Sequence, residues 1–575
     1  MSELISGGEA LLRCLLNEGV DRIFGYPGGS IMPVYDNLYD HTHELKHILC
    51  RHEQGAIHAA QGYARATGRV GVVIATSGPG AMNLITGIAD AHMDSTPLVI
   101  ITGQVGTSVL GTDAFQETDM IDVTNPISKW GVQLRNAADI PDILSKAFYI
   151  ASTGRPGPVL IDFPKNVQTE TTEWTFYKPC SYIRTYVSRP ELNGYLLSKA
   201  AHLINESHRP MILAGQGITI SGAENALLQL AEKADIPVAA TLLGLSSLPS
   251  KHRLFKGMLG MHGNLGPNVA TNKADLLIAV GMRFDDRVVG KLSAYAPNAK
   301  IIHIDIDPSE IGRTVKVDVA VHADARDALE ALLPLVNIGN RQEWLSLFSK
   351  TEKIEVDKVI SRQLQRPANS TIVMGEVIDA VSTAVNDDAI LVTDVGQNQM
   401  FAARYFRFTS PRSMITSGGL GTMGFGLPAA IGAKMGRPER QVILFCGDGG
   451  FQMTCQELGT IMEYDVPVKI VILNNNFLGN VRQWQEMFFN KRFSQTPLLN
   501  PDFVLLARAY GIKAEEVKDR TELQDAVNRM IESPHAYILN VNIEPNDNIF
   551  PMTPVGSAVD DILLNKDEKL DLSQL

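Results

Sequence analysis

Short, continuous hydrophobic runs alternate with amphipathic segments along most of this chain. Each run is bounded by Gly, Pro, Asn or Asp, as is typical of strands that end in turns. The expected strands form three groups, at 70–76, 98–102 and 159–162; at 211–214, 238–241, 276–280 and 301–306; and at 390–393, 442–446, 469–473 and 537–541. Strands that are apolar on both faces are typical of parallel sheets covered by helices. We therefore predict an α/β fold of three doubly wound domains with mainly parallel sheets.

Two polar stretches, at 168–190 and 337–370, separate these groups, and the second contains a helical pattern over 343–359. A length of 575 residues also suggests three or four domains, at about 150 residues per domain. The domains are expected at 1–180, 190–340 and 370–550, followed by an irregular tail at 551–575.

A faint internal repeat links the first and third groups. Residues 76–80 (TSGPG) are followed by a helix, by Asp94 to Pro97 and by a strand, and residues 447–450 (GDGG) are followed by a helix, by Asp465 to Pro467 and by a strand. A duplication explains this likeness, and so does the independent use of one strand–loop–helix pattern. The sequence alone leaves both explanations open.

Composition narrows the class of protein. The net charge of −12 argues against nucleic acid or an anionic membrane as the main partner. No apolar run approaches the ~18 residues that a membrane helix needs, and the first twenty residues read as an amphipathic helix rather than a signal peptide. The five cysteines include no C-x-x-C pair, which favours reduced thiols and a cytoplasmic protein.

The clearest chemical signal lies at the ends of two strands in the third group. Gly447-Asp448-Gly449 follows one strand, and Asn474-Asn475-Asn476 follows the next. Parallel strands end at the same sheet edge, where open α/β sheets bind ligands. The oxygens of Asp448 and Asn475 and a loop carbonyl, that of Phe477, suit Mg²⁺, which takes further ligands from water and phosphates. The glycines Gly447 and Gly449 allow a diphosphate to approach the backbone.

This spacing resembles the motif of the thiamine diphosphate (ThDP) enzymes. The resemblance implies a carboxylic acid that bonds the aminopyrimidine ring of ThDP, and it assigns this role to Glu53 in Arg51-His52-Glu53-Gln54. By itself this segment is an ordinary acidic helix N-terminus. In the family the acid and the diphosphate motif come from different subunits, which implies a homodimer or a tetramer built from dimers.

Two further segments resemble ThDP contacts of this family. Gly396, Gln397 and Asn398 correspond to a loop at the diphosphate, although the family usually has His where this chain has Asn398. Gly421 and Met423 correspond to the segment whose bulky side chain bends ThDP, and core packing is the other explanation for Met423.

Six motifs extend the resemblance to the catalytic (large) subunits of the acetohydroxyacid synthase, or acetolactate synthase, family, over the chain to about residue 554. They lie at 24–29, 111–117, 152–158, 257–263, 283–287 and 481–485. The family binds a structural FAD in its middle domain, and a strand followed by Gly-Gln-Gly also suits a nucleotide. The implied flavin contacts are Arg155, Gly215, Gln216, Gly217, Met261, His262, Arg283, Asp305 and Asp324.

The resemblance implies the decarboxylation of pyruvate and the transfer of its two-carbon unit to pyruvate or 2-ketobutyrate. The products, 2-acetolactate and 2-aceto-2-hydroxybutyrate, are precursors of valine, leucine and isoleucine. Arg287 is expected to bind the acceptor carboxylate, unless it is a surface residue paired with Asp285 or Asp286, and Trp484 to favour 2-ketobutyrate. The family places further residues near the reacting carbon, namely Phe115, Gln116, Lys165, Met423 and Val481.

Asn480 replaces the Met of many members. A small regulatory subunit is also implied. The alternatives are a pyruvate oxidase, or another 2-ketoacid decarboxylase or carboligase that uses ThDP and FAD, and a non-catalytic protein that keeps the fold.

Overall fold

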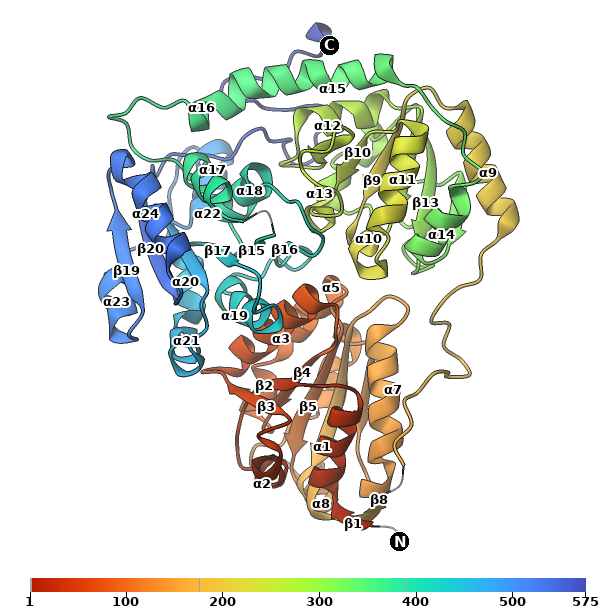
Figure 1. Cartoon of the computed structure of the whole chain (residues 1–575), viewed down its shortest axis with the longest axis vertical. Coiled ribbons are helices and arrows are strands. Elements are labelled where there is room, and N and C mark those ends of the chain that lie inside the picture. The colour runs from red at the N-terminus through yellow and green to blue at the C-terminus, as the bar shows by residue number, and fades with distance from the viewer. Residues whose placement is uncertain (1–2, 175, 387) are drawn as a thin grey trace.

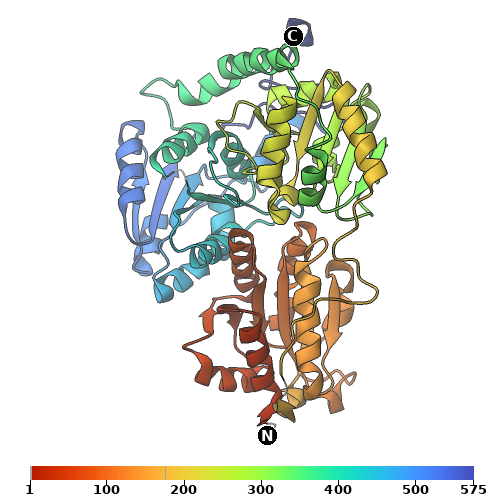
Figure 2. The same ribbon diagram turned by 45° about the vertical axis from the view of Figure 1, so that its right-hand side comes forward.

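The computed structural model describes residues 3–174, 176–386 and 388–575. Three six-stranded parallel sheets, each covered by helices, form three domains around a common junction (Figure 1). The α/β fold with three doubly wound domains is thus confirmed. In the turned view the first domain lies below the other two, which stand side by side (Figure 2).

The first sheet has the order β3-β2-β4-β5-β7-β6. Its strands are β2 (Arg22–Tyr26), β3 (Lys46–Leu49), β4 (Gly71–Ala75), β5 (Leu98–Gln104), β6 (Trp130–Gln133) and β7 (Pro158–Pro164). Its helices are α1 (Gly7–Asn17), α2 (Met32–His41), α3 (Glu53–Thr67), α4 (Pro79–Met82), α5 (Ile85–Met93), α6 (Met120–Thr124), α7 (Ile140–Ser152) and α8 (Lys165–Thr169).

The third sheet has the order β16-β15-β17-β18-β20-β19. Its strands are β15 (Ile390–Thr393), β16 (Met414–Ile415), β17 (Val442–Gly447), β18 (Lys469–Asn474), β19 (Lys513–Val517) and β20 (Tyr537–Asn542). Its helices are α17 (Met374–Ala384), α18 (Gln397–Tyr405), α19 (Gly426–Gly436), α20 (Asp448–Thr454), α21 (Leu458–Tyr464), α22 (Gly479–Phe488), α23 (Phe503–Ala509) and α24 (Arg520–Glu532).

Numbered by appearance within each domain, the strands of both sheets run 2-1-3-4-6-5. The two segments of the faint repeat follow the third strand in each domain. This shared topology favours the duplication over independent use of one local pattern.

The middle sheet differs, with the order β11-β10-β9-β12-β13-β14, or 3-2-1-4-5-6 by appearance. This is the strand order of dinucleotide-binding folds. Its strands are β9 (Pro210–Ala214), β10 (Val238–Ala240), β11 (Phe255–Met258), β12 (Leu276–Val280), β13 (Lys300–Asp305) and β14 (Val319–His322). Its helices are α9 (Gly194–Glu206), α10 (Gln216–Ser221), α11 (Glu224–Ala234), α12 (Leu265–Lys273), α13 (Asp286–Val289) and α14 (Ala325–Leu332), and α15 (Gln342–Glu355) and α16 (Ser361–Leu364) lead to the third domain.

Helices α3 and α19 join the first and third domains through small residues. A Cβ built on Gly62 would lie 2.7 Å from the Ala429 Cα, and one on Gly432 would lie 2.6 Å from the Ala59 carbonyl carbon. The two backbones therefore pack directly on each other. Because α3 begins at Glu53 and α19 follows Met423, this contact positions two predicted ThDP residues.

Two segments are more ordered than the sequence suggests. Inside the expected polar linker at 168–190, β8 (Thr171–Trp174) pairs antiparallel with β1 (Glu3–Ser6). The tail at 551–575 is irregular, as expected, but Ile562, Leu564 and Leu570 are buried in the core of the middle domain. Within the described residues, no helix is both long and apolar enough to cross a membrane.

Candidate active site and cofactor pocket

The predicted metal ligands meet at one sheet edge. Asp448 begins α20 directly after β17, and Asn475 directly follows the neighbouring strand β18. Both side chains are buried, and desolvation raises the pKa of Asp448 to about 6. The Asn475 side-chain oxygen accepts from the Phe477 N–H at 3.1 Å, which fixes the turn that carries the third predicted ligand.

The sequence analysis missed Asn500 at this edge. Its amide nitrogen donates to Asp448 Oδ2 (2.6 Å), Asn474 Oδ1 (3.0 Å) and Asn476 Oδ1 (3.1 Å). Asn500 therefore links the two strand-end loops. It lies 52 residues from Asp448, in a segment without a motif, so no sequence signal pointed to it.

The segment with Gly421 and Met423 lies beside this turn. The Met423 methyl group is 3.8 Å from where a Cβ on Gly449 would be. The buried carboxylate of Asp394, which the sequence analysis did not single out, accepts from the backbone N–H groups of Gly424 and Gly426. Asp394 thus holds the segment against the end of β15.

In the expected diphosphate loop, the side-chain amides of Gln397 and Asn398 bond to the protein itself. Gly396 has a φ of 143°, a conformation that favours glycine, and α18 begins at Gln397. Asn398 donates both amide hydrogens to backbone carbonyls, those of Asp394 (2.8 Å) and Phe445 (3.1 Å). Because those hydrogens are already used, this conformation offers a phosphate no side-chain donor from Asn398. The Gln397 amide likewise donates to Gln483 Oε1 (3.0 Å).

Glu53 is the first residue of α3 and is 8% exposed. Its Oε2 accepts a hydrogen bond from the Asn83 amide at 2.9 Å. Asn83 was not predicted, and it leaves Glu53 oriented by a neutral donor rather than neutralised by a cation. A buried acid held in this way can share a proton with a ligand nitrogen.

The loop at 111–117 projects from the first domain. Glu117 closes it by accepting from the N–H groups of Gly111 (2.5 Å) and Ala114 (2.9 Å). Gln116 has a φ of 60°, and Phe115 is 87% exposed. Lys165, at the start of α8, and Val481, on α22, are also exposed in the single chain.

A cavity of about 1320 Å³ lies at the junction of the three domains. All of the predicted flavin residues except Gly215 line the cavity, and Gly215 is next to Gln216, which does. The lining residues are Arg155, Gln216, Gly217, Met261, His262, Arg283, Asp305 and Asp324. Pockets for small molecules usually measure about 300–1,000 Å³. This cavity therefore has room for a dinucleotide and a further ligand.

The walls of the cavity suit a flavin nucleotide. A Cβ on Gly217 would lie 2.5 Å from the Gly281 Cα, so the turn after β9 depends on glycine. Asp305 lies at the carboxyl end of β13, and burial raises its pKa to about 6. His262 Nδ1 is buried without a partner in the described chain, and burial lowers the pKa of His262 to about 3, so that the ring is neutral.

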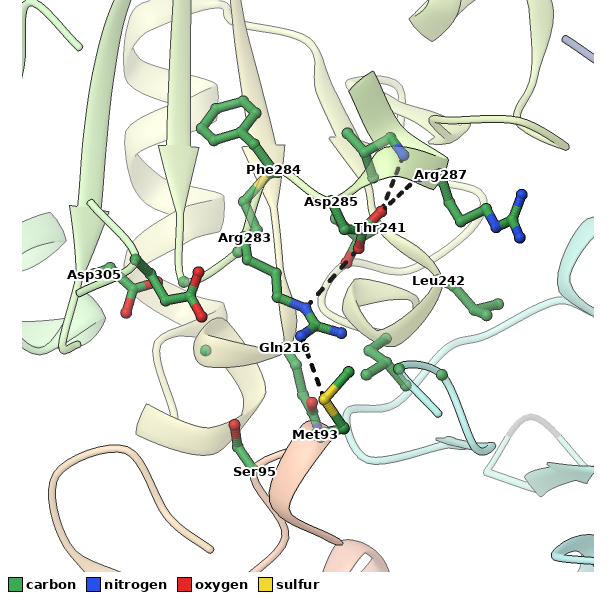
Figure 3. A pocket seen from close by; sticks show the side chains of 18 of the residues that line it. Met93, Ser95, Gln216, Thr241, Leu242, Arg283, Phe284, Asp285, Arg287 and Asp305 are labelled. Carbon is green, nitrogen blue, oxygen red and sulfur yellow. Dashed lines mark hydrogen bonds and ion pairs between the residues drawn. The ribbon is translucent and has the colours of Figure 1, made fainter. Parts of the chain in front are cut away.

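Arg283 points into the cavity between Met93 and Asp285 (Figure 3). Its guanidinium is 4.0 Å from the Met93 sulfur and 4.0 Å from Asp285 Oδ2. Arg155 donates to Ser95 Oγ (2.9 Å) and forms ion pairs with Asp307 and Glu310. The first domain therefore supplies part of the wall.

Arg287 and Trp484 line the same cavity, together with Gly421. Arg287 is largely exposed and lies 3.8 Å from the exposed Asp286, a geometry in which an ion pair contributes little. Its guanidinium is therefore free to bind another carboxylate. Neither Glu53 nor Asp448 lines this cavity in the single chain.

Family comparisons agree with this arrangement. Residues 5–123, 197–332 and 394–541 match the N-terminal TPP-binding, central and C-terminal TPP-binding domains of the thiamine pyrophosphate enzymes, TPP being another name for ThDP. The chain therefore belongs to the thiamine pyrophosphate enzymes, a class that binds ThDP.

Its relatives identify the branch of that class. It is 46% identical to a probable acetolactate synthase large subunit of Methanocaldococcus jannaschii, with 97% of this chain and 95% of the relative covered. It is 45% identical to the acetolactate synthase large subunit of Lactococcus lactis (97% and 96% covered) and 41% identical to the isozyme 3 large subunit of Escherichia coli (99% and 100%). Within the class, the chain belongs with the acetolactate synthase large subunits.

Proposed function

We propose that this chain decarboxylates pyruvate and joins the remaining two-carbon unit to pyruvate or 2-ketobutyrate. The products are 2-acetolactate and 2-aceto-2-hydroxybutyrate, at the first common step of branched-chain amino acid biosynthesis. One observation carries the proposal most directly. Arg287 and Trp484, the residues expected to bind the second ketoacid, line one cavity with Gly421 of the segment that leads to Met423.

The residues present fit the proposed cofactors. Asp448 and Asn475 supply oxygens for Mg²⁺. A Cβ on Gly447 would meet only Asn398 Oδ1, at 3.7 Å, so the backbone at this glycine suits the close approach of a diphosphate. The 3-2-1-4-5-6 sheet suits FAD, which we propose as a structural group, and so does His262 Nδ1, which has no partner among the residues that the structure describes. Bound ThDP supplies the nucleophilic carbon and accepts the electrons released with CO₂.

Each protein group has a defined task in this proposal. Glu53, oriented by Asn83, shares a proton with the aminopyrimidine ring. Arg287 binds the carboxylate of the acceptor ketoacid through its guanidinium. Trp484 forms the apolar wall that accommodates the extra methyl group of 2-ketobutyrate.

Protein groups also exclude water from the reacting carbon. We assign this task to the side chains that the family places there, which are Phe115, Gln116, Lys165, Met423 and Val481. Phe115, Lys165 and Val481 are exposed in the single chain, which supports burial by a second copy. We therefore propose a homodimer, or a tetramer of two dimers, in which Glu53 of one copy faces Asp448 of the other.

The relatives are named large subunits, which supports a small regulatory partner for this chain as well. We propose that the protein acts in the cytoplasm. The partner is tested by adding a candidate small subunit and measuring the rate and its response to valine.

The reaction is tested with purified protein and pyruvate under argon, with ThDP, Mg²⁺ and FAD added or omitted. We expect acetolactate without an added electron acceptor, and a loss of product when ThDP or Mg²⁺ is removed. A pyruvate oxidase would form no acetolactate and would need an acceptor. No turnover of pyruvate under either condition would refute both.

A further inference from the structure

One loop of the third domain faces both proposed cofactor sites. Residues 417–421 line the large cavity. Met423, two residues further on, lies against Gly449 of the diphosphate turn. Any ligand that orders this loop from one side therefore affects the other side.

Asp94, from the first domain, holds the loop at its start. This carboxylate is 1% exposed and accepts from the N–H groups of Gly418 (2.8 Å) and Gly419 (2.7 Å). Arg65 of α3 donates to the same carboxylate (3.2 Å) and to the Thr416 carbonyl (2.6 Å). The three donors stabilise a buried charge that would otherwise be costly.

Asp90, one helical turn earlier on α5, joins the two ends of the loop. Its Oδ1 accepts from the hydroxyl of Ser417 and from that of Thr422 (2.9 Å), and the Ser417 hydroxyl accepts from the Thr422 N–H (2.8 Å). Two like charges at i and i+4 repel each other, and Asp90 is fully buried. Stability alone therefore explains the pair Asp90 and Asp94 poorly. Their hydrogen bonds instead fix the shape of the loop at 417–421.

The same end of α5 also contacts the wall of the cavity. Met93 lies 4.0 Å from a nitrogen of Arg283, and Ser95 accepts from Arg155 at 2.9 Å. Both arginines are predicted flavin residues. Contacts of four residues at and just beyond the end of α5 thus join the cavity wall to the loop that leads to Met423.

We propose that Asp90 and Asp94 are positioning residues that couple the two cofactor sites, so that a flavin in the large cavity and ThDP at the diphosphate turn each strengthen the binding of the other. The identity of the two ligands rests on the proposed function. The coupling must be reciprocal, because it is a property of one thermodynamic cycle.

The experiment measures FAD affinity by the quenching of flavin fluorescence, in the full-length protein with and without saturating ThDP and Mg²⁺. In the wild type we expect ThDP to lower the Kd of FAD by about fivefold or more, within the usual range of coupling. In Asp94→Asn the coupling should fall below about twofold, because one side-chain oxygen becomes a donor that faces backbone N–H groups.

Thr422→Val removes only the hydroxyl that donates to Asp90 and keeps every charge. If Asp94→Asn does not fold, this second variant still tests whether the loop contacts carry the coupling between FAD and ThDP binding. Asp235→Asn is the matched control. Asp235 is buried, accepts from Arg253 (2.7 Å) and from the Arg341 N–H (2.8 Å), and does not line the cavity. Its variant should keep the coupling of the wild type.

The proposal is overturned if the wild type shows no coupling, if Thr422→Val and Asp94→Asn keep it in full, or if Asp235→Asn loses it equally. Acetolactate formation by the wild type is measured separately. Coupling without acetolactate formation would refute the proposed reaction but not the coupling. Acetolactate formation without coupling would refute the coupling but not the proposed reaction.

Discussion

The contact between α3 and α19 leads to a sharp prediction about Gly62. A Cβ there would lie 2.7 Å from both the Cα and the carbonyl carbon of Ala429, and closer still to its carbonyl oxygen, where ordinary contacts begin near 3.4 Å. All three obstacles are backbone atoms, so no side chain can rotate away. The two carbons alone require the helices to separate by roughly 0.7 Å, and the oxygen requires more. Gaps of roughly 0.5–1 Å already forfeit about a quarter to a half of the dispersion energy of the affected contacts.

Two opposing terms set the size of the effect. Replacing Gly by Ala inside a helix stabilises it by about 1 kcal/mol, while overpacking of a tight interior costs about 1–3 kcal/mol and occasionally more. Because Ala59 and Ala429 are fully buried and the neighbours are backbone, we expect overpacking to prevail. Gly62→Ala should then lose about 2 kcal/mol, which corresponds to a fall in Tm of roughly 4–8 °C for a domain of this size.

The assay is differential scanning calorimetry at one scan rate, with ThDP binding measured in parallel. Gly194→Ala is the matched control, because a Cβ on Gly194, at the start of α9, would meet nothing within 4 Å. That variant should change stability by less than about 0.5 kcal/mol. A Gly62→Ala protein that melts at or above the wild-type temperature would refute the packing argument.

Four further predictions concern single side chains. Glu53→Gln should lower acetolactate formation by about 10²–10⁴-fold, as expected for the loss of an acid–base group, with an unchanged circular dichroism spectrum; near-normal turnover would remove Glu53 from the reaction. Trp484→Leu should lose a preference for 2-ketobutyrate of about tens-fold and keep pyruvate condensation, so an unchanged product ratio would contradict the wall assignment. Asn500→Ala should raise the Mg²⁺ concentration for half-saturation by about 10–100-fold, measured by calorimetry with ThDP present, whereas an unchanged value would show that Asp448 needs no such support. Burial lowers the pKa of Lys129 from 10.5 to about 7. Between pH 7 and 10 the unfolded chain therefore keeps a proton on Lys129 that the folded chain has released, so the free energy of unfolding should rise with pH, by up to about 1.4 kcal/mol per pH unit. This rise should be missing in Lys129→Met, and equal pH profiles of the two proteins would refute the prediction.

The sequence predicted every interior strand except β2, which begins with a partly buried Arg22 and ends with an exposed Tyr26. The runs at 70–76, 442–446 and 469–473 became β4, β17 and β18, all of them interior strands. Edge strands such as β3 and β6 were missed because they are short and mix polar with apolar residues. Their assignment depends on a neighbouring strand and not on a pattern of their own.

The candidate site was predicted to a similar extent. Glu53, Asp448 and Asn475 were singled out because their spacing or their family position is informative, and the structure buries all three. Asn83 and Asn500 were missed because single polar residues between motifs carry no signal. The role of Asp90 and Asp94 depends on contacts more than 320 residues away in the chain, which no local pattern encodes.

The matching strand orders of the first and third domains have a consequence for how this chain arose. The loop after the third strand occupies the same place in both domains. When the two segments of the repeat are aligned, Ser77 of the first domain corresponds to Asp448 of the third. A duplication, which the shared topology favours, leaves the two copies with acids at different places: Asp448 lies in this loop of the third domain, and Glu53 begins α3, before the third strand of the first domain. The two domains thus share one topology but carry different acids, and the proposed reaction needs both acids.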